Sequence, residues 1–299
     1  MSDAPARDVA VLGLGQMGGG IARNLDRAGL LGAVWDPRED VRAPYQGRND
    51  VVVSPPGGLP GACRRFVFVV PSTREIGECL DGAGAMLSRM DGASVIFDLT
   101  TSDPAESGSL AAAALERGIE YLDCGMTGGA TGADAGKLKL MIGGREATIG
   151  KNRAMLGAFA DQIFHVGPPG SGHALKLIHN MVLHTMFFAN VEGVRAAARF
   201  GIPARTVIDV FNSGNARSYI SEFRFPRHIL SGKWDARSKV SNLEKDLRMA
   251  TAMADREAAP TPFGDMTTRM LGRALDRGMA DTDFSRLYEV FEEIVDSNS

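Results

Sequence analysis

Lys176 is the residue whose neighbours most strongly suggest chemistry. It follows the glycine-rich turn Gly170-Ser171-Gly172 and stands at the start of a long apolar segment. At about 100° per residue, Lys176 and Asn180 share one face of a helix. An amine stacked with a carboxamide in this way could act as a proton donor with its orienting partner. The common alternative is a solvated surface lysine, but a second motif at the other end of the chain disfavours it.

That second motif is a glycine-rich turn that predicts a dinucleotide site. A strand-length apolar run ends in Gly13-Leu14-Gly15-Gln16-Met17-Gly18, and a helical pattern follows from Ile21. The first glycine allows a tight turn, the second lets a pyrophosphate approach the backbone, and the third lets the helix pack close to the strand. The phosphates would lie at the helix N-terminus, where free N–H groups favour an anion. Asp36, about 20 residues on, completes the motif.

Composition and charge agree with an enzyme of two domains. The chain has 299 residues, of which 44% are hydrophobic and 23% charged, and its net charge is −3. It therefore has no basic footprint for nucleic acid. We find neither a signal-peptide pattern nor an apolar run of membrane-spanning length, and no set of residues with metal-ligand spacing. The scattered cysteines, Cys63, Cys79 and Cys124, indicate reduced thiols, so we expect a cytoplasmic protein.

Alternating strand and helix patterns in the first half predict a mostly parallel sheet with helices on both faces. Helical patterns fill 73–90, 104–117 and 146–159, whereas 37–60 is poor in helix signals and predicts a loop or a shortened crossover. The predicted strands cover 9–12, 33–35, 50–54, 66–70, 94–98, 119–123, 138–142 and 162–166.

After Gly172 the pattern becomes entirely helical. One apolar segment from Ala174 to about Phe200 would be a connecting helix of about 40 Å. We therefore predict a Rossmann-like α/β domain over 1–168 and an all-helical domain over 169–299. Because the connecting segment is apolar around most of its circumference, we also expect a homodimer or homotetramer.

Polar groups at the ends of other strands are further candidates, since ligands bind beyond the carboxyl ends of such strands. The glycine-rich segment Asp123–Gly136 follows a strand, and successive N–H groups at Thr127, Gly128 and Gly129 could hold a carboxylate; an ordinary flexible turn is equally possible. Ser102 and Asp103 precede Pro104 and are expected to cap a helix. His173 could face the same cleft as Lys176, although a structural histidine is the commoner case.

Taken together, these motifs resemble the β-hydroxyacid dehydrogenase family, which includes 3-hydroxyisobutyrate dehydrogenase and tartronate semialdehyde reductase. The resemblance covers essentially the whole chain and rests on four motifs in the family's order. These are Gly13–Leu25, Asp123–Gly136, Gly170–Asn180 and Lys245-Asp246-Leu247.

The resemblance implies a role for each matching residue. Lys176 would be the general acid/base and Asn180 its partner on the substrate. Thr127, Gly128 and Gly129 would bind a substrate carboxylate. The cofactor would contact the glycine turn and further residues at Asp36, Pro71, Thr101 and Lys245.

Several positions depart from the family's pattern. Gly125, Met126 and Thr127 replace the usual Pro, Val and Ser, and we expect Gly125 to loosen the substrate loop. His179 replaces the first of two adjacent asparagines, and Ser238, followed by Lys239, stands where relatives usually carry an aromatic residue. These changes affect the identity of the substrate and not the reaction class.

We therefore predict hydride transfer between a nicotinamide cofactor and a small 3-hydroxy acid or its semialdehyde or keto form. The cofactor is expected to be NAD, with NADP possible, because Asp36 can accept hydrogen bonds from ribose hydroxyls while Arg38 could pair with a 2′-phosphate. Two alternatives are an imine reductase and a non-catalytic nucleotide-binding scaffold. Lys176 argues against the first, and the intact pair of Lys176 and Asn180 argues against the second.

Overall fold

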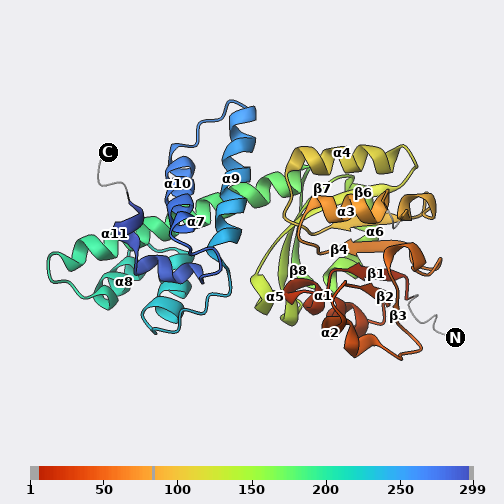
Figure 1. Cartoon of the computed structure of the whole chain (residues 1–299), viewed down its shortest axis with the longest axis horizontal. Helices are drawn as coiled ribbons and strands as arrows, with labels where there is room; N and C mark the ends of the chain where they lie inside the picture. The colour runs from red at the N-terminus through yellow and green to blue at the C-terminus, as the bar shows by residue number, and fades with distance from the viewer. Residues whose placement is uncertain (1–6, 83–84, 296–299) are drawn as a thin grey trace. The chain divides into compact units, whose positions relative to one another are not determined.

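The computed structural model describes residues 7–82 and 85–295 (Figure 1). The chain divides into two compact units, Met1–Lys176 and Leu177–Ser299, here called the sheet unit and the helical unit. The division falls inside one long helix, eight residues after the predicted boundary at Pro168. It does so because the first turn of that helix packs directly on the sheet.

The described part of the sheet unit contains one eight-stranded sheet of order β3-β2-β1-β4-β5-β6-β7-β8. The β6–β7 pair is antiparallel, and every other neighbouring pair is parallel. The predicted mostly parallel sheet is therefore confirmed. Its strands are β1 (Val9–Leu12), β2 (Leu31–Trp35), β3 (Val52–Val53), β4 (Arg65–Phe68), β5 (Val95–Asp98), β6 (Glu120–Thr127), β7 (Leu138–Gly143) and β8 (Ala160–Gly167).

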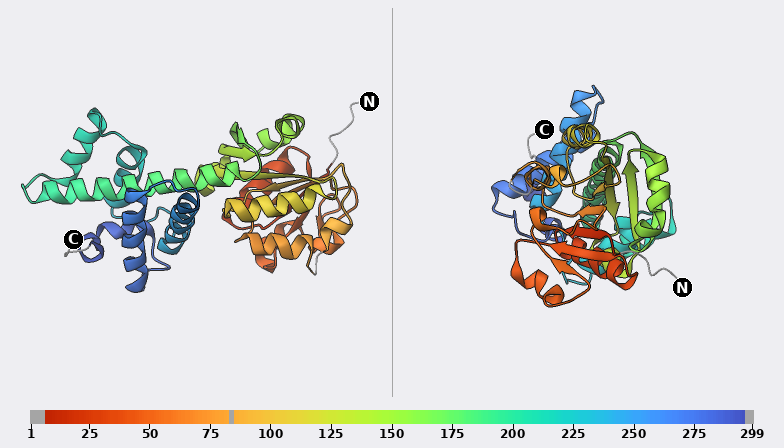
Figure 2. Two further views of the ribbon diagram at one scale, coloured as in Figure 1. Left: turned by 90° about the horizontal axis from the view of Figure 1, so that it is seen from above. Right: turned by 90° about the vertical axis from the view of Figure 1, so that its right-hand side faces the viewer.

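Helices cover both faces of this sheet, because the strands are apolar on both sides. One core cluster joins alternate strand residues to α1 (Gln16–Arg27), α5 (Gly129–Ala135) and α6 (Glu146–Gly157). A second cluster joins the intervening strand residues to α3 (Thr73–Leu80) and α4 (Pro104–Leu115), which lie side by side (Figures 1 and 2). This alternation of burial is the pattern of a doubly wound sheet.

The connection predicted to be a loop or a shortened crossover contains little regular structure. Only α2 (Glu39–Arg42), short 3₁₀ turns and β3 occupy 37–60. The helical pattern over 73–90 was too long, since α3 ends at Leu80 and a 3₁₀ turn follows at Met86–Ser88.

The helical unit continues from the long helix α7 (Ser171–Ala198), as predicted. Its core is aromatic and aliphatic, with Phe187, Phe225 and Leu247 fully buried. The other helices of the described part of this unit are α8 (Ala204–Ser213), a π-helical segment at Ile220–Ile229, α9 (Val240–Arg256), α10 (Pro262–Asp276), a 3₁₀ helix at Phe284–Tyr288 and α11 (Phe291–Ile294).

Candidate active site

The glycine turn between β1 and α1 is shaped by close backbone contacts. Gly13 has a φ of +94°, and a Cβ there would overlap the carbonyl oxygen of Val69 beyond β4. A Cβ on Gly18 would overlap the carbonyl oxygen of Gly13. Gly15 is different, because its nearest neighbour on that side is Arg38 Nη2 at 3.8 Å. The turn is thus closely packed at Gly13 and Gly18 but open at Gly15. The open side is where the N–H groups of α1 would meet phosphates, which fits a dinucleotide.

Asp36 lies directly after β2 and supports this turn from the side. Its buried carboxylate accepts a hydrogen bond from Leu14 N at 2.8 Å. It also accepts two hydrogen bonds from Arg38, from Nε at 3.0 Å and from Nη2 at 3.1 Å. Burial alone would raise the pKa of Asp36, but these hydrogen bonds outweigh it and bring the pKa below its usual range. From the sequence, Asp36 favours NAD and Arg38 favours NADP, whereas in the structure the two side chains form one ion pair.

Helix α1 packs closely against α5, the helix within the second glycine-rich segment. A Cβ on Gly20 would lie 2.8 Å from the backbone carbon of Ala133. Asn24 Nδ2 donates to the carbonyl oxygen of Ala133 at 2.7 Å, and Arg23 pairs with Asp134. Gly20, which follows the Gly13–Gly18 turn, therefore has a packing role. The contact also holds the two glycine-rich turns near each other.

Thr127, Gly128 and Gly129 form the junction between β6 and α5. β6 pairs with β5 only as far as Asp123 and then extends beyond it, paired with β7. Gly128 and Gly129 have φ angles of +121° and +63°, and both are exposed. The first N–H groups of α5 have no partner within that helix. This end of the strand therefore presents backbone donors on the same sheet edge as the α1 turn.

Lys176 packs against the same strand. A Cβ on Gly125 would lie 2.6 Å from both Lys176 Cβ and the carbonyl oxygen of Gly172. Residues two apart on a strand face the same way, so Thr127 follows Gly125 on the face that Lys176 touches. The expectation that Gly125 loosens a loop is wrong, because Gly125 is a buried strand residue paired with Met141.

His173 does not share an open cleft with Lys176, because its side chain is completely buried. Its Nδ1 lies 2.7 Å from Ser107 Oγ on α4, and its Nε2 lies 3.1 Å from the carbonyl oxygen of Asp98. Burial raises the pKa of the neighbouring Asp98, which accepts a hydrogen bond from Tyr121. His173 is therefore a structural residue that ties α7 to β5 and α4.

In the helical unit, Asp246 joins two of the predicted site residues. Asn180 lies one turn after Lys176 on α7, and its Nδ2 donates to Asp246 Oδ2 at 2.7 Å. Lys245 Nζ lies 3.5 Å from Asp246 Oδ1. From the sequence, Asp246 is only the middle residue of the Lys245-Asp246-Leu247 motif. Its bridging role could not be predicted, because the spacing of residues along the chain does not show that α9 packs against α7.

Other strand-end residues lie where they were expected, beyond β4 and β5. Pro71 is exposed and Thr101 is half-buried. Asp103 caps α4 by accepting a hydrogen bond from Ala105 N at 2.9 Å, as predicted. Ser102 does not cap, because its buried Oγ has no hydrogen-bond partner among the described residues.

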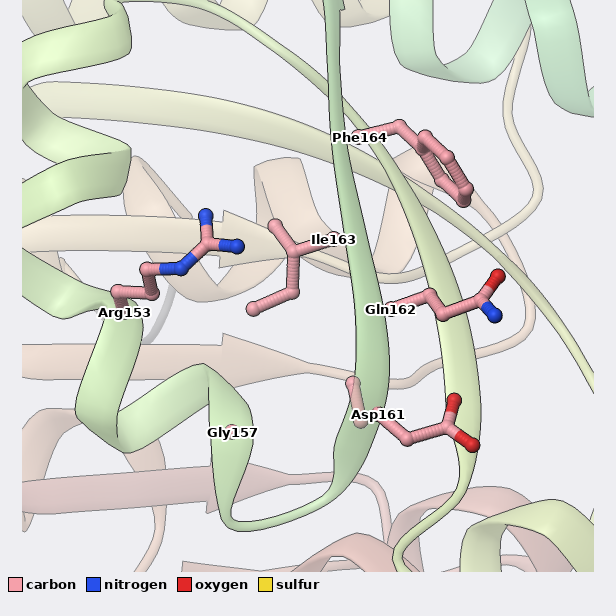
Figure 3. A pocket seen from close by; sticks show the side chains of 7 residues that line it. Arg153, Gly157, Asp161, Gln162, Ile163 and Phe164 are labelled. Atoms are coloured by element: carbon pink, nitrogen blue, oxygen red, sulfur yellow. The ribbon is translucent and has the colours of Figure 1, made fainter.

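A surface pocket lies away from these residues, between α6 and the edge strand β8. Arg153 of α6 extends toward Ile163 of β8 (Figure 3). None of the predicted site residues lines this pocket. Within residues 7–82 and 85–295 we find no cluster of ligating side chains that could hold a metal ion. No helix in the same ranges is long and apolar enough to cross a membrane.

Two family models match the chain one after the other, and the first match includes the glycine turn. Residues 8–167 match the family model described as the NAD binding domain of 6-phosphogluconate dehydrogenase. Residues 170–291 match the NAD-binding domain of NADP-dependent 3-hydroxyisobutyrate dehydrogenase. The chain belongs to the β-hydroxyacid dehydrogenase family. It is an oxidoreductase that uses a nicotinamide dinucleotide.

The similar relatives match over almost their whole length. The chain is 27% identical to 2-(hydroxymethyl)glutarate dehydrogenase of Eubacterium barkeri, covering 96% of this chain and 95% of that protein. It is 26% identical to human mitochondrial 3-hydroxyisobutyrate dehydrogenase, covering 98% and 89%. A solved structure of Mycobacterium tuberculosis 3-hydroxyisobutyrate dehydrogenase with L-serine superposes with a TM-score of 0.86 at 25% identity, covering 95% and 98%.

Proposed function

We propose that the protein interconverts a small 3-hydroxy acid and its semialdehyde or keto form, with Lys176 as the general acid/base. The observation that carries this proposal is the packing of Lys176 against β6 at Gly125, two residues before Thr127 and the exposed glycines that follow it. A proton-transfer group and a set of backbone donors thus lie along one strand, on the sheet edge that also carries the dinucleotide turn. When bound, the nicotinamide supplies the hydride chemistry.

Lys176 moves the proton that accompanies the reaction. In reduction its ammonium protonates the developing alkoxide oxygen, and in oxidation the neutral amine takes the hydroxyl proton.

Thr127, Gly128 and Gly129 hold the substrate carboxylate. An anion there would accept hydrogen bonds from the uncovered N–H groups at the start of α5 and from the Thr127 hydroxyl. Asn180 binds the reacting oxygen of the substrate, and its hydrogen bond to Asp246 fixes the orientation of the amide.

NAD is the preferred cofactor. Asp36 presents a buried, ionised carboxylate beside the glycine turn, and such a group suits ribose hydroxyls better than a phosphate. Arg38 is already engaged by Asp36. Pro71 and Thr101, on the same sheet edge, contact the cofactor, and the resemblance to the family adds Lys245 as a cofactor-contacting residue.

The protein works as a homo-oligomer in the cytoplasm. Leu175, Ile178 and Val182 are 38%, 40% and 49% exposed and form one apolar stripe on α7. A second copy of the chain would cover this stripe. The free cysteines fit a reducing compartment.

The test is the change in absorbance at 340 nm when the protein is mixed with NAD and a panel of hydroxy acids. Each acid is paired with its uncharged alcohol analogue. The proposal predicts turnover of at least one 3-hydroxy acid and little turnover of its analogue. Equal turnover of acid and analogue would refute the carboxylate role, and no turnover of any acid would refute the substrate class.

A further inference from the structure

The N-terminus of α7 is capped by a side chain from a different element. The residue before the helix is Gly170, which has no side chain to accept the free N–H groups of the first turn. Asp123, in the middle of β6, does so instead. Its Oδ1 accepts from Gly170 N at 2.8 Å, and its Oδ2 accepts from His173 N at 2.9 Å.

This cap is fully buried, which makes it both strong and costly to remove. The Asp123 side chain has no solvent exposure. A carboxylate at a helix N-terminus interacts favourably with the helix dipole, and hydrogen bonds to an ionised acceptor are stronger than neutral ones. If the carboxylate were lost, two buried backbone donors would remain unsatisfied.

The first turn of α7 also meets the β6–β7 pair through close glycine contacts. A Cβ on Gly172 would lie 2.5 Å from the carbonyl oxygen of Met141 and 2.9 Å from Gly143 N. A Cβ on Gly125 would lie 2.6 Å from Lys176 Cβ. The helix therefore rests on the backbone of the β6–β7 pair, and any side chain at these positions would hold it further away.

We propose that Asp123 and Gly125 are positioning residues that set the place of Lys176 relative to the end of β6. Asp123 holds the first turn of α7 in place against β6. Gly125 allows Lys176 to lie against the same strand, which continues to Thr127. The inference rests on the proposed function of Lys176 as the proton-transfer group. Neither residue touches the substrate; both act through α7.

The experiment compares Asp123→Asn and Gly125→Ala with wild type. Asp123→Asn keeps the shape of the side chain but leaves one oxygen where two oxygens accepted hydrogen bonds. Gly125→Ala keeps the capping carboxylate and places a methyl group against Lys176 Cβ and the carbonyl oxygen of Gly172. Both are expected to lower kcat at least tenfold, because small displacements of a reacting group have large effects on rate. Cofactor affinity should stay within twofold, since the glycine turn after β1 is untouched.

A control variant separates positioning from stability. Leu156→Ala removes a fully buried side chain of α6, a helix that carries none of the proposed site residues. It should lower the melting temperature while leaving kcat unchanged. The inference is overturned if folded Asp123→Asn and Gly125→Ala both retain kcat within twofold of wild type, or if Leu156→Ala lowers kcat as much as they do.

A second readout does not depend on turnover. After reductive ¹³C-methylation, the NMR signal of Lys176 reports its surroundings, and Lys176→Arg assigns the signal. The inference predicts that Asp123→Asn and Gly125→Ala shift this signal while Leu156→Ala does not. An inactive wild type with these shifts would refute the proposed function alone, whereas unchanged spectra would refute the positioning role.

Discussion

At the scale of single residues, the proposed preference for NAD rests on one carboxylate with several partners. Asp36 accepts hydrogen bonds from Leu14 N and from Arg38, so it supports the glycine turn. The pKa of Asp36 lies below its usual range, so the group is ionised at every pH at which the enzyme would be assayed. A 2′-phosphate would meet this negative charge.

We therefore predict that Asp36→Asn raises the use of NADP relative to NAD. The neutral amide removes the repulsion and releases Arg38 to pair with a phosphate. The measurement is kcat/KM with each cofactor. Arg38→Ala is the matched variant and should change the ratio in the opposite direction. A wild type that prefers NADP, or an unchanged ratio in Asp36→Asn, would show that Asp36 does not select the cofactor.

At the scale of elements, the contact between α1 and α5 can be tested with two helical glycines. A Cβ on Gly20 would meet the backbone of Ala133 at 2.8 Å, whereas a Cβ on Gly108 in α4 would meet nothing within 4 Å. Gly20→Ala should therefore lower the melting temperature by several degrees and weaken cofactor binding. Gly108→Ala should stabilise the protein by about 0.5–1 kcal/mol, since alanine is the better helix former. Thermal unfolding of both variants checks this, and an equal gain in the two would disprove the close packing.

The elements themselves could be predicted because they depend on local patterns. The strands could be predicted from the apolar runs, and the turn after β1 from the spacing of its glycines. Contacts between distant parts of the chain could not be predicted in this way. The cap of α7 joins Asp123 to Gly170 and His173, and the bridge at Asp246 joins α9 to α7. Neither has a signal in the spacing of residues. The sequence left two alternatives open for His173, a cleft residue or a structural histidine, since helical angle alone does not say which neighbours bury a side chain.

At the scale of the whole molecule, the exposed stripe on α7 predicts self-association. We expect a dimer or a larger assembly at micromolar concentration, and Val182→Asp should shift it toward the monomer, because a charge cannot be buried there without a partner. Leu115→Asp is the matched control, since Leu115 is 59% exposed on α4 and is not part of the stripe. Light scattering gives the mass. A monomeric wild type, or equal effects of the two variants, would contradict the role of the stripe.

The central claim for the molecule is that Lys176 transfers the proton that accompanies hydride transfer. The most direct measurement is the single-turnover rate of NADH formation at 340 nm in Lys176→Ala, with Lys151→Ala on α6 as the matched lysine control. We predict a loss of about 10² to 10⁴ in rate for Lys176→Ala, with unchanged folding and cofactor affinity, and no loss for the control. A rate within a few-fold of wild type in folded, cofactor-binding Lys176→Ala would contradict the claim.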